Sequence, residues 1–138
     1  MKILIDTDIL IDVALNRAPH ANRAGRLLDC LERNDASGFM AWHSASNFYY
    51  LVSPKRGKQD TRSFLLELTD FVEIASCSTE SLRQAARLDL KDFEDAMQVA
   101  AALACGADVI ATRNVRDCVK SPIEAATPGS ILKSLATE

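Results

Sequence analysis

Residues 2–12 read KILIDTDILID, a short apolar run that ends in one acid and is followed two residues later by another. The run predicts a strand over residues 2–6, because parallel strands covered on both faces are apolar almost throughout. Asp8 is a candidate cap for a helix that continues through Leu15, since its carboxylate can accept bonds from the free amides of a first helical turn. A strand passing directly into a helix is the opening unit of an α/β fold.

The remaining sequence repeats this alternation of strand and helix. Further strands are predicted at residues 36–42, 71–75, 108–111 and near Ala125, and further helices at residues 21–33, 44–52, 60–68, 92–104, from Ser78 or Thr79, and from Gly129. Ser44 is the expected N-cap of the helix over residues 44–52, with Pro54 and Gly57 ending it, and Gly106 is the expected stop of the helix over residues 92–104. The pattern predicts a three-layer α/β sandwich, with a mostly parallel sheet flanked by helices.

The length and composition indicate one domain covering residues 1–138. Hydrophobic residues make up 48% and charged residues 25%, as in an ordinary globular domain, and the net charge is −3. The protein as a whole therefore does not attract nucleic acid, and a polyanionic partner would need a local basic patch or a bound cation. No signal peptide or membrane-spanning segment is recognisable, which predicts a cytoplasmic protein without membrane contact.

The cysteines do not suggest a zinc site. Cys30, Cys77, Cys105 and Cys118 form no C-x-x-C pair, and the chain has only two histidines to join them. Free thiols in a reducing compartment are the simplest interpretation.

Acidic and amide side chains follow two of the predicted strands. Asp6 and Asp8 follow the first strand, and Asn114 and Asp117 follow the strand at residues 108–111. Ligands of open parallel sheets bind at the carboxyl ends of the strands, so both groups are expected at one edge. Asp92 and Asp95 lie three residues apart in the first turn of the helix over residues 92–104, where the helix dipole favours negative charge.

A convergence of carboxylates favours a hard divalent cation. Without one, the carboxylates repel one another and raise each other's pKa. Oxygen ligands suit Mg²⁺ or Mn²⁺, which can activate water and stabilise charge on a phosphate. The sequence offers no Ser/His/Asp set, Cys/His set, G-x-x-x-x-G-K-[ST] loop or G-x-G-x-x-G loop, so metal-assisted hydrolysis is the chemistry that its residues support.

Three segments together resemble the PIN-domain family, in particular its VapC-like toxin branch. They are ILIDTDILID at residues 3–12, DFEDAMQVA at residues 92–100 and ADVIATRNVRD at residues 107–117. The resemblance spans almost the whole chain. It implies a metal-dependent ribonuclease fold, a cognate antitoxin partner of a type II toxin–antitoxin pair, and a homodimer. It also implies that Asp6, Asp95 and Asp117 are the catalytic, metal-binding acids.

Other residues have supporting roles in this interpretation. Asp92 is a further candidate metal ligand. The residues expected to lie beside the metal ligands and to orient them are Asp8, Asn47, Thr112 and Asn114. Arg113 and Arg116 are candidate contacts to RNA phosphate. Asp12 is expected to be a solvated helix residue, and Trp42 and His43 to be structural. The residues expected to pack in the core or a dimer interface are Phe48, Tyr49 and Tyr50.

The sequence departs from the family pattern at one position. The family usually supplies a Glu from the helix after the second strand, and Asn47 occupies that place. An amide can ligate a metal but brings no charge, so the site would bind its ion more weakly, hold one ion rather than two, or be inactive. The alternative function is therefore a catalytically weak or inactive PIN domain that binds RNA or protein.

Two other acidic α/β folds fit less well. A haloacid dehalogenase-like phosphatase also places D-x-D after a strand, but it usually continues with Gly-Thr, where this sequence has Ile9-Leu10. A response-regulator receiver would place an acid at the end of the third strand, where this sequence has Ser76.

Overall fold

The computed structural model describes residues 1–137 and confirms the three-layer α/β architecture. Within these residues the chain forms a five-stranded sheet in the order β3-β2-β1-β4-β5, and every neighbouring pair is parallel. The strands are β1 (Lys2–Ile5), β2 (Ser37–Met40), β3 (Val72–Ile74), β4 (Val109–Ala111) and β5 (Glu124–Ala126). Ile3 of the central strand β1 is in register with Gly38 on one side and Val109 on the other.

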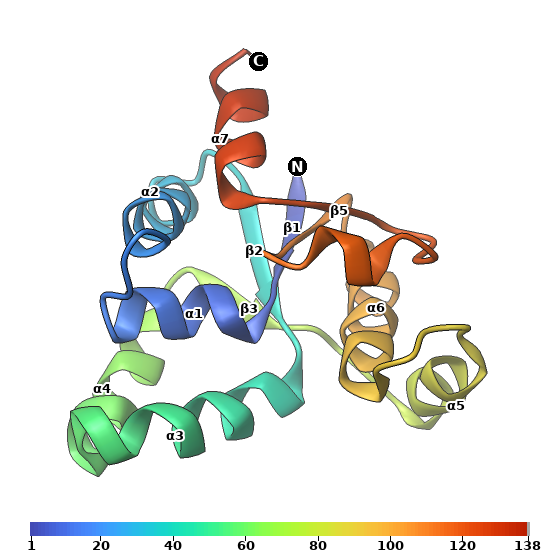
Figure 1. The fold of residues 1–138 in the computed structure, drawn as a ribbon, viewed down its shortest axis with the longest axis horizontal. Helices are drawn as coiled ribbons and strands as arrows, with labels where there is room; N and C mark the ends of the chain where they lie inside the picture. The colour runs from blue at the N-terminus through green and yellow to red at the C-terminus, as the bar shows by residue number, and fades with distance from the viewer. Residues whose placement is uncertain (138) are drawn as a thin grey trace.

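Helices cover both faces of this sheet (Figure 1). They are α1 (Thr7–Ala14), α2 (Ala21–Glu32), α3 (Trp42–Arg56), α4 (Lys58–Leu68), α5 (Thr79–Arg87), α6 (Phe93–Cys105) and α7 (Pro128–Ala136), with a short 3-10 helix η1 (Val115–Cys118) after β4. None of these helices is long and apolar enough to cross a membrane.

The alternation of side chains along β1 divides the core into two layers. Ile3 and Ile5 are fully buried in a cluster that includes residues of α1, α2, α3 and α7. Leu4 points the other way and packs with Val99 of α6 and Ile110 of β4. Successive side chains of a strand face opposite sides of the sheet. The apolar run that opens the chain therefore holds helices on both faces.

Helix α6 packs closely because most of its buried side chains are alanine. Ala101 and Ala102 are buried among the sheet residues, whereas Ala96 and Ala100 pack on Ala85 of α5. The helix ends at Gly106, as predicted, and this residue adopts the left-handed conformation at φ 69°. That conformation is nearly free of strain for glycine alone.

Two predicted N-caps were wrong. Asp6, not Asp8, occupies the N-cap position of α1, and its side chain makes no capping bond there. Helix α3 begins at Trp42, two residues before Ser44, and continues through Pro54 to Arg56. Pro54 has no amide hydrogen to donate to the carbonyl four residues earlier, and the helix ends two residues after it.

Ser44 has a different role from the predicted one, because it is buried inside the first turn of α3. Its hydroxyl oxygen accepts a hydrogen bond from Thr7 Oγ1 at 2.9 Å and from Gln98 Nε2 at 2.8 Å. Thr7 belongs to α1 and Gln98 to α6. This buried polar contact joins the three helices that surround the carboxyl end of β1.

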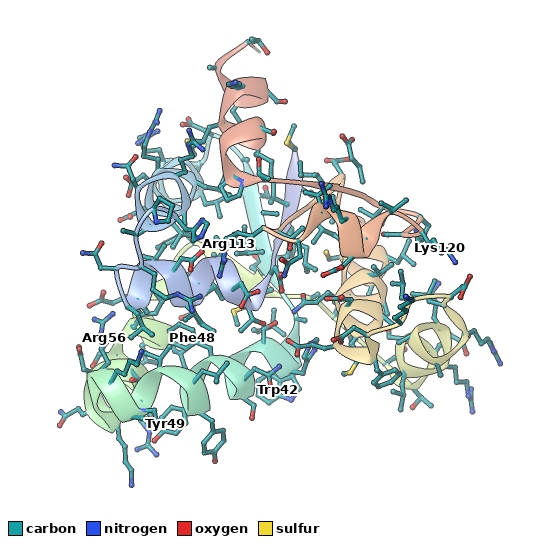
Figure 2. The ribbon with its side chains drawn as sticks, in the orientation of Figure 1. Trp42, Phe48, Tyr49, Arg56, Arg113 and Lys120 are labelled. Carbon is teal, nitrogen blue, oxygen red and sulfur yellow. The ribbon has the colours of Figure 1, made fainter. Side chains whose placement is uncertain are left out.

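The aromatic residues of α3 differ in their burial, and Phe48 agrees with the prediction of core packing. Phe48 is fully buried and stacks on Phe64 of α4, with ring centroids 5.1 Å apart. Trp42 and Tyr50 are each 72% exposed, so neither is part of the core. The predicted structural role of Trp42 is therefore wrong for the single chain, because its side chain projects into solvent (Figure 2).

Candidate active site

A pocket of about 450 Å³ lies at the carboxyl edge of the sheet. Four segments far apart in sequence form it: the β1–α1 junction, α3, the start of α6 and the turn after β4. Among the described residues, no basic side chain lines the pocket. Six carboxylates line it: Asp6, Asp8, Asp92, Glu94, Asp95 and Asp117. The pocket therefore brings together all four predicted metal ligands, together with Asp8, Asn47 and Asn114.

The pairing of β1 with β4 places Asp6 beside Thr112. Ile5 is in register with Ala111, so the residues that follow the two strands are also neighbours. The Thr112 hydroxyl donates a hydrogen bond to Asp6 Oδ2 at 2.9 Å. It also accepts one from the backbone N–H of Asn114 at 3.0 Å. Thr112 thus connects the first acid of the pocket to the turn that carries Asn114 and Asp117.

The start of α6 brings three more acids to the pocket. Asp92 is the N-cap, and its Oδ1 accepts hydrogen bonds from the backbone amides of Glu94 at 2.8 Å and Asp95 at 3.3 Å. These bonds satisfy amides that would otherwise have no partner within the helix. One oxygen of Asp92 is therefore committed to the helix, while the residue still lines the pocket.

The electrostatics of the pocket are those of crowded carboxylates. Burial raises the pKa of Asp6 to about 6, opposed by the Thr112 hydrogen bond and reinforced by the charge of Asp8. Burial also raises the pKa of Asp95 to about 6, with further contributions from Asp92, Asp117 and Glu94. Such shifts are typical of acids that lack a compensating cation.

Cys118 lies within reach of the same negative charge. Burial raises the pKa of its thiol to about 11, and Asp95, Asp6 and Asp117 add to the effect. In the metal-free protein the group therefore stays a neutral thiol near pH 7.

The donors of the pocket suit a hard cation that keeps much of its water. They are carboxylate, amide and hydroxyl oxygens. Among the residues that the structure describes, no three Asp, Glu, His or Cys side chains are grouped closely enough to hold an ion by themselves. Mg²⁺ commonly binds one or two protein carboxylates and completes its shell with water and substrate phosphate oxygens. Which of the four predicted acids bind an ion stays a prediction.

Asp12 has a structural role, and the expectation of a solvated residue was wrong. It is fully buried, with Arg17 Nη2 at 2.8 Å from Oδ1 and Arg113 Nε at 2.9 Å from Oδ2. Its spacing of three residues from the buried Ile9 was the available signal, because positions i and i+3 share a helix face. A buried carboxylate requires such partners.

The two candidate RNA-contacting arginines lie in different surroundings. The Arg113 side chain lies over α1, where the ion pair with Asp12 engages it (Figure 2). Arg116 lines a second hollow of about 520 Å³ that shares Asp92, Asp95 and Asp117 with the acidic pocket. Lys91 and Lys120 also line this hollow, so positive charge adjoins the acids on one side.

Glu94 is the charged pocket residue that the sequence interpretation missed, and the uncharged lining residues that it missed are Thr7, Ser46, Tyr50 and Leu51. Glu94 lies in the first turn of α6 and lines the pocket with Asn47 of α3. Asn47 Nδ2 donates a hydrogen bond to Glu94 Oε1 at 3.0 Å. The only sequence signal was the dense run of acids at residues 92–95, which does not indicate a partner 47 positions away.

The fold and the pocket together define a parallel α/β domain with an acidic site at the carboxyl edge of its sheet. A protein-family model described as PIN domain matches residues 2–116, and the chain therefore belongs to the PIN-domain family. No curated protein matches the sequence.

Solved structures share this fold at low sequence identity. The structure of VapBC2 from Rickettsia felis, bound to a DNA fragment from the promoter, matches with a TM-score of 0.72 at 18% identity, over 92% of this chain and 98% of that one. VapBC-1 from nontypeable Haemophilus influenzae matches with a TM-score of 0.68 at 15% identity, over 94% and 99%. Mycobacterium tuberculosis VapC20, a sarcin-ricin loop cleaving toxin, matches with a TM-score of 0.62 at 16% identity, over 78% and 86%.

Proposed function

We propose that this protein is a Mg²⁺- or Mn²⁺-dependent RNA endonuclease that hydrolyses phosphodiester bonds, and that it is the toxin of a type II toxin–antitoxin pair. The observation that carries the proposal is the acidic pocket, in which the pKa values of Asp6 and Asp95 are raised to about 6. The PIN-domain family and the fold shared with an RNA-cleaving toxin support the choice of RNA.

In this proposal the cation binds among Asp6, Asp95 and Asp117, with Asp92 as a further candidate. One or two of these carboxylates hold it directly, and the others contact it through its bound water. When bound, the cation stabilises charge on the scissile phosphate and lowers the pKa of a water nucleophile. Thr112 orients Asp6 by donating to Oδ2, which leaves the other oxygen of that carboxylate available. Asn114 contacts the same β1–α1 junction, since its Nδ2 donates to Asp8 Oδ2 at 3.5 Å.

The hollow beside the pocket offers a path for the RNA backbone. A protein with a net charge of −3 needs a local basic surface to bind a polyanion. Lys91 and Arg116 supply that charge next to Asp95 and Asp117, whereas Lys120 of the same hollow forms an ion pair with Asp89 at 3.0 Å. We assign Arg116 as an RNA contact on this basis, whereas Arg113 is engaged by Asp12.

A cognate antitoxin is the proposed protein partner, and the cytoplasm is the proposed location. The acidic pocket would accept a basic side chain of the partner, because an opposite charge relieves the repulsion between its carboxylates. The family resemblance also motivates a homodimer, and the exposed aromatic residues Trp42 and Tyr50 of α3 offer apolar contact surface.

The competing proposal is a PIN domain that binds RNA or protein without cutting. The observation behind it is Asn47, a neutral residue on the α3 wall of the pocket. The phosphatase alternative has no support beyond D-x-D, since the chain belongs to a different family.

Cleavage of a mixed pool of structured RNAs distinguishes the two proposals. The purified protein is incubated with Mn²⁺ or Mg²⁺, with EDTA, and beside Asp6→Asn and Asp95→Asn proteins prepared identically. We expect cleavage that requires metal and is lost in both variants, with unchanged circular dichroism. Cleavage by the variants at the wild-type rate would reject the site, and no cleavage with either metal would favour the binding-only domain.

A further inference from the structure

The walls of the acidic pocket differ in charge. The β1–α1 junction, the start of α6 and the turn after β4 each contribute carboxylates. Helix α3 contributes only uncharged residues to the lining, among them Ser46, Asn47 and Tyr50. A cation in the pocket would therefore face negative charge on three sides and neutral groups on the fourth.

Glu94 brings a carboxylate across to that fourth side. Its Oε1 lies 3.0 Å from Nδ2 of Asn47, although the two residues belong to different helices. The backbone of Glu94 is held in place, because its amide donates to the N-cap side chain of Asp92 at 2.8 Å. An exposed glutamate normally samples many rotamers in water, and a bond to a fixed amide restricts that freedom.

Asn47 suits this role because of its chemistry. An asparagine amide donates through nitrogen and cannot repel a neighbouring carboxylate, whereas an acid at the same position would. Its position on α3 is fixed by the core, since the next residue, Phe48, is fully buried. Asn47 therefore offers the Glu94 carboxylate an uncharged donor from a helix that the core holds in place.

We propose that Glu94 supplies the negative charge at the α3 wall of the pocket, and that Asn47 is the positioning residue that holds it there. The inference deepens the proposed metal-dependent cleavage and rests on it. Interactions just outside the direct ligands of a metal typically change its affinity 10- to 100-fold, so the effect is measurable.

The test measures Mn²⁺ binding to the RNA-free protein, by the electron paramagnetic resonance signal of unbound Mn²⁺. The variants are Glu94→Gln, Asn47→Ala and the charge exchange Asn47→Glu/Glu94→Gln, with Glu32→Gln as the matched control. Glu32 is an exposed residue at the end of α2 and does not line the acidic pocket. Cleavage of the RNA pool is followed in parallel, and circular dichroism verifies folding.

We expect Glu94→Gln to weaken Mn²⁺ binding about 10-fold or more, Asn47→Ala to weaken it less, and the charge exchange to return it toward the wild-type value. Glu32→Gln should change nothing. Equal Mn²⁺ affinity for Glu94→Gln and Glu32→Gln, in a series where Asp95→Asn abolishes binding, would overturn the inference and leave the proposed function intact. A folded charge-exchange protein that binds no better than Glu94→Gln would also overturn it. A wild-type protein that neither binds Mn²⁺ nor cleaves would instead overturn the proposed function.

Discussion

At the scale of single residues, the acids of this chain divide into those that are compensated and those that are not. Asp12 is fully buried between the guanidinium groups of Arg17 and Arg113. Asp6 has one hydrogen bond from Thr112, and its pKa is nevertheless raised. Proteins tolerate uncompensated buried acids mainly at functional sites. Asp6 is therefore a candidate functional residue, whereas Asp12 is structural.

Replacement of Asp12 tests this division. Asp12→Ala leaves two half-buried arginines without their common partner, and we expect the free energy of unfolding to fall by about 3 kcal/mol. Urea denaturation measures the change. Asp35→Ala is the matched control, because the pair of Asp35 with Arg33 is exposed, and such pairs contribute about 1 kcal/mol or less. Equal effects of the two variants would contradict the structural role of Asp12.

At the scale of elements, α6 holds its acids in the pocket because specific residues fix both of its ends. Asp92 caps its start and Gly106 ends it in the left-handed conformation. Between them, small side chains allow close packing on the sheet and on α5. The first turn, with Glu94 and Asp95, is thereby held at the carboxyl edge of the strands.

Replacing a glycine by alanine should change the unfolding free energy in opposite directions at the end of a helix and inside a helix. Gly106→Ala has space for its Cβ, since the nearest atom is 3.9 Å away, but φ 69° is strained for alanine. We expect a loss of about 1 kcal/mol in unfolding free energy. Gly25→Ala lies inside α2, where a Cβ meets nothing within 4 Å, and should stabilise the protein by about 0.5–1 kcal/mol. Thermal melts measure both, and changes of the same sign would refute the explanation.

At the scale of the whole molecule, folding itself crowds the carboxylates, because four segments distant in sequence meet at the pocket. The folded-state pKa values of Asp6 and Asp95 are about 6, above the usual 3.8. The native state therefore binds protons more tightly than the unfolded state. Below about pH 4 both carboxyls are protonated in either state and do not lower the unfolding free energy. As the pH rises to about 6 they ionise in the unfolded state, which lowers the unfolding free energy, and above about pH 6 the loss no longer grows.

We accordingly expect the unfolding free energy of the metal-free protein to fall between about pH 4 and pH 6 through these groups. Asp95→Asn, which cannot ionise, should be more stable than wild type at pH 7 by about 1 kcal/mol in EDTA. This is less than the pKa shift alone implies, because water screens the partly exposed carboxylate. Mn²⁺ should raise the melting temperature of the wild type and not of the variant. Denaturation at four pH values, with EDTA and with Mn²⁺, measures this, and identical pH slopes for the two proteins would contradict it.

The sequence alone determined the α/β architecture, helix α6 with its glycine stop, and the group of acids at the carboxyl edge. These features follow from local rules: the burial pattern of a strand, the period of a helix, and the meeting of parallel strand ends at one edge. They need no knowledge of which distant residues touch. The same rules misplaced the start of α3, because Ser44 resembles a cap but is bonded to Thr7 and Gln98 instead.

Only the tertiary structure decided the partners of individual side chains. The contact of Asn47 with Glu94 spans 47 positions, and Asp6 meets Thr112 across 106. Asp12 was judged solvated because its second partner, Arg113, follows β4 at the far end of the chain. Such contacts depend on how strands and helices pack around β1, and periodicity along the chain contains no information about that packing.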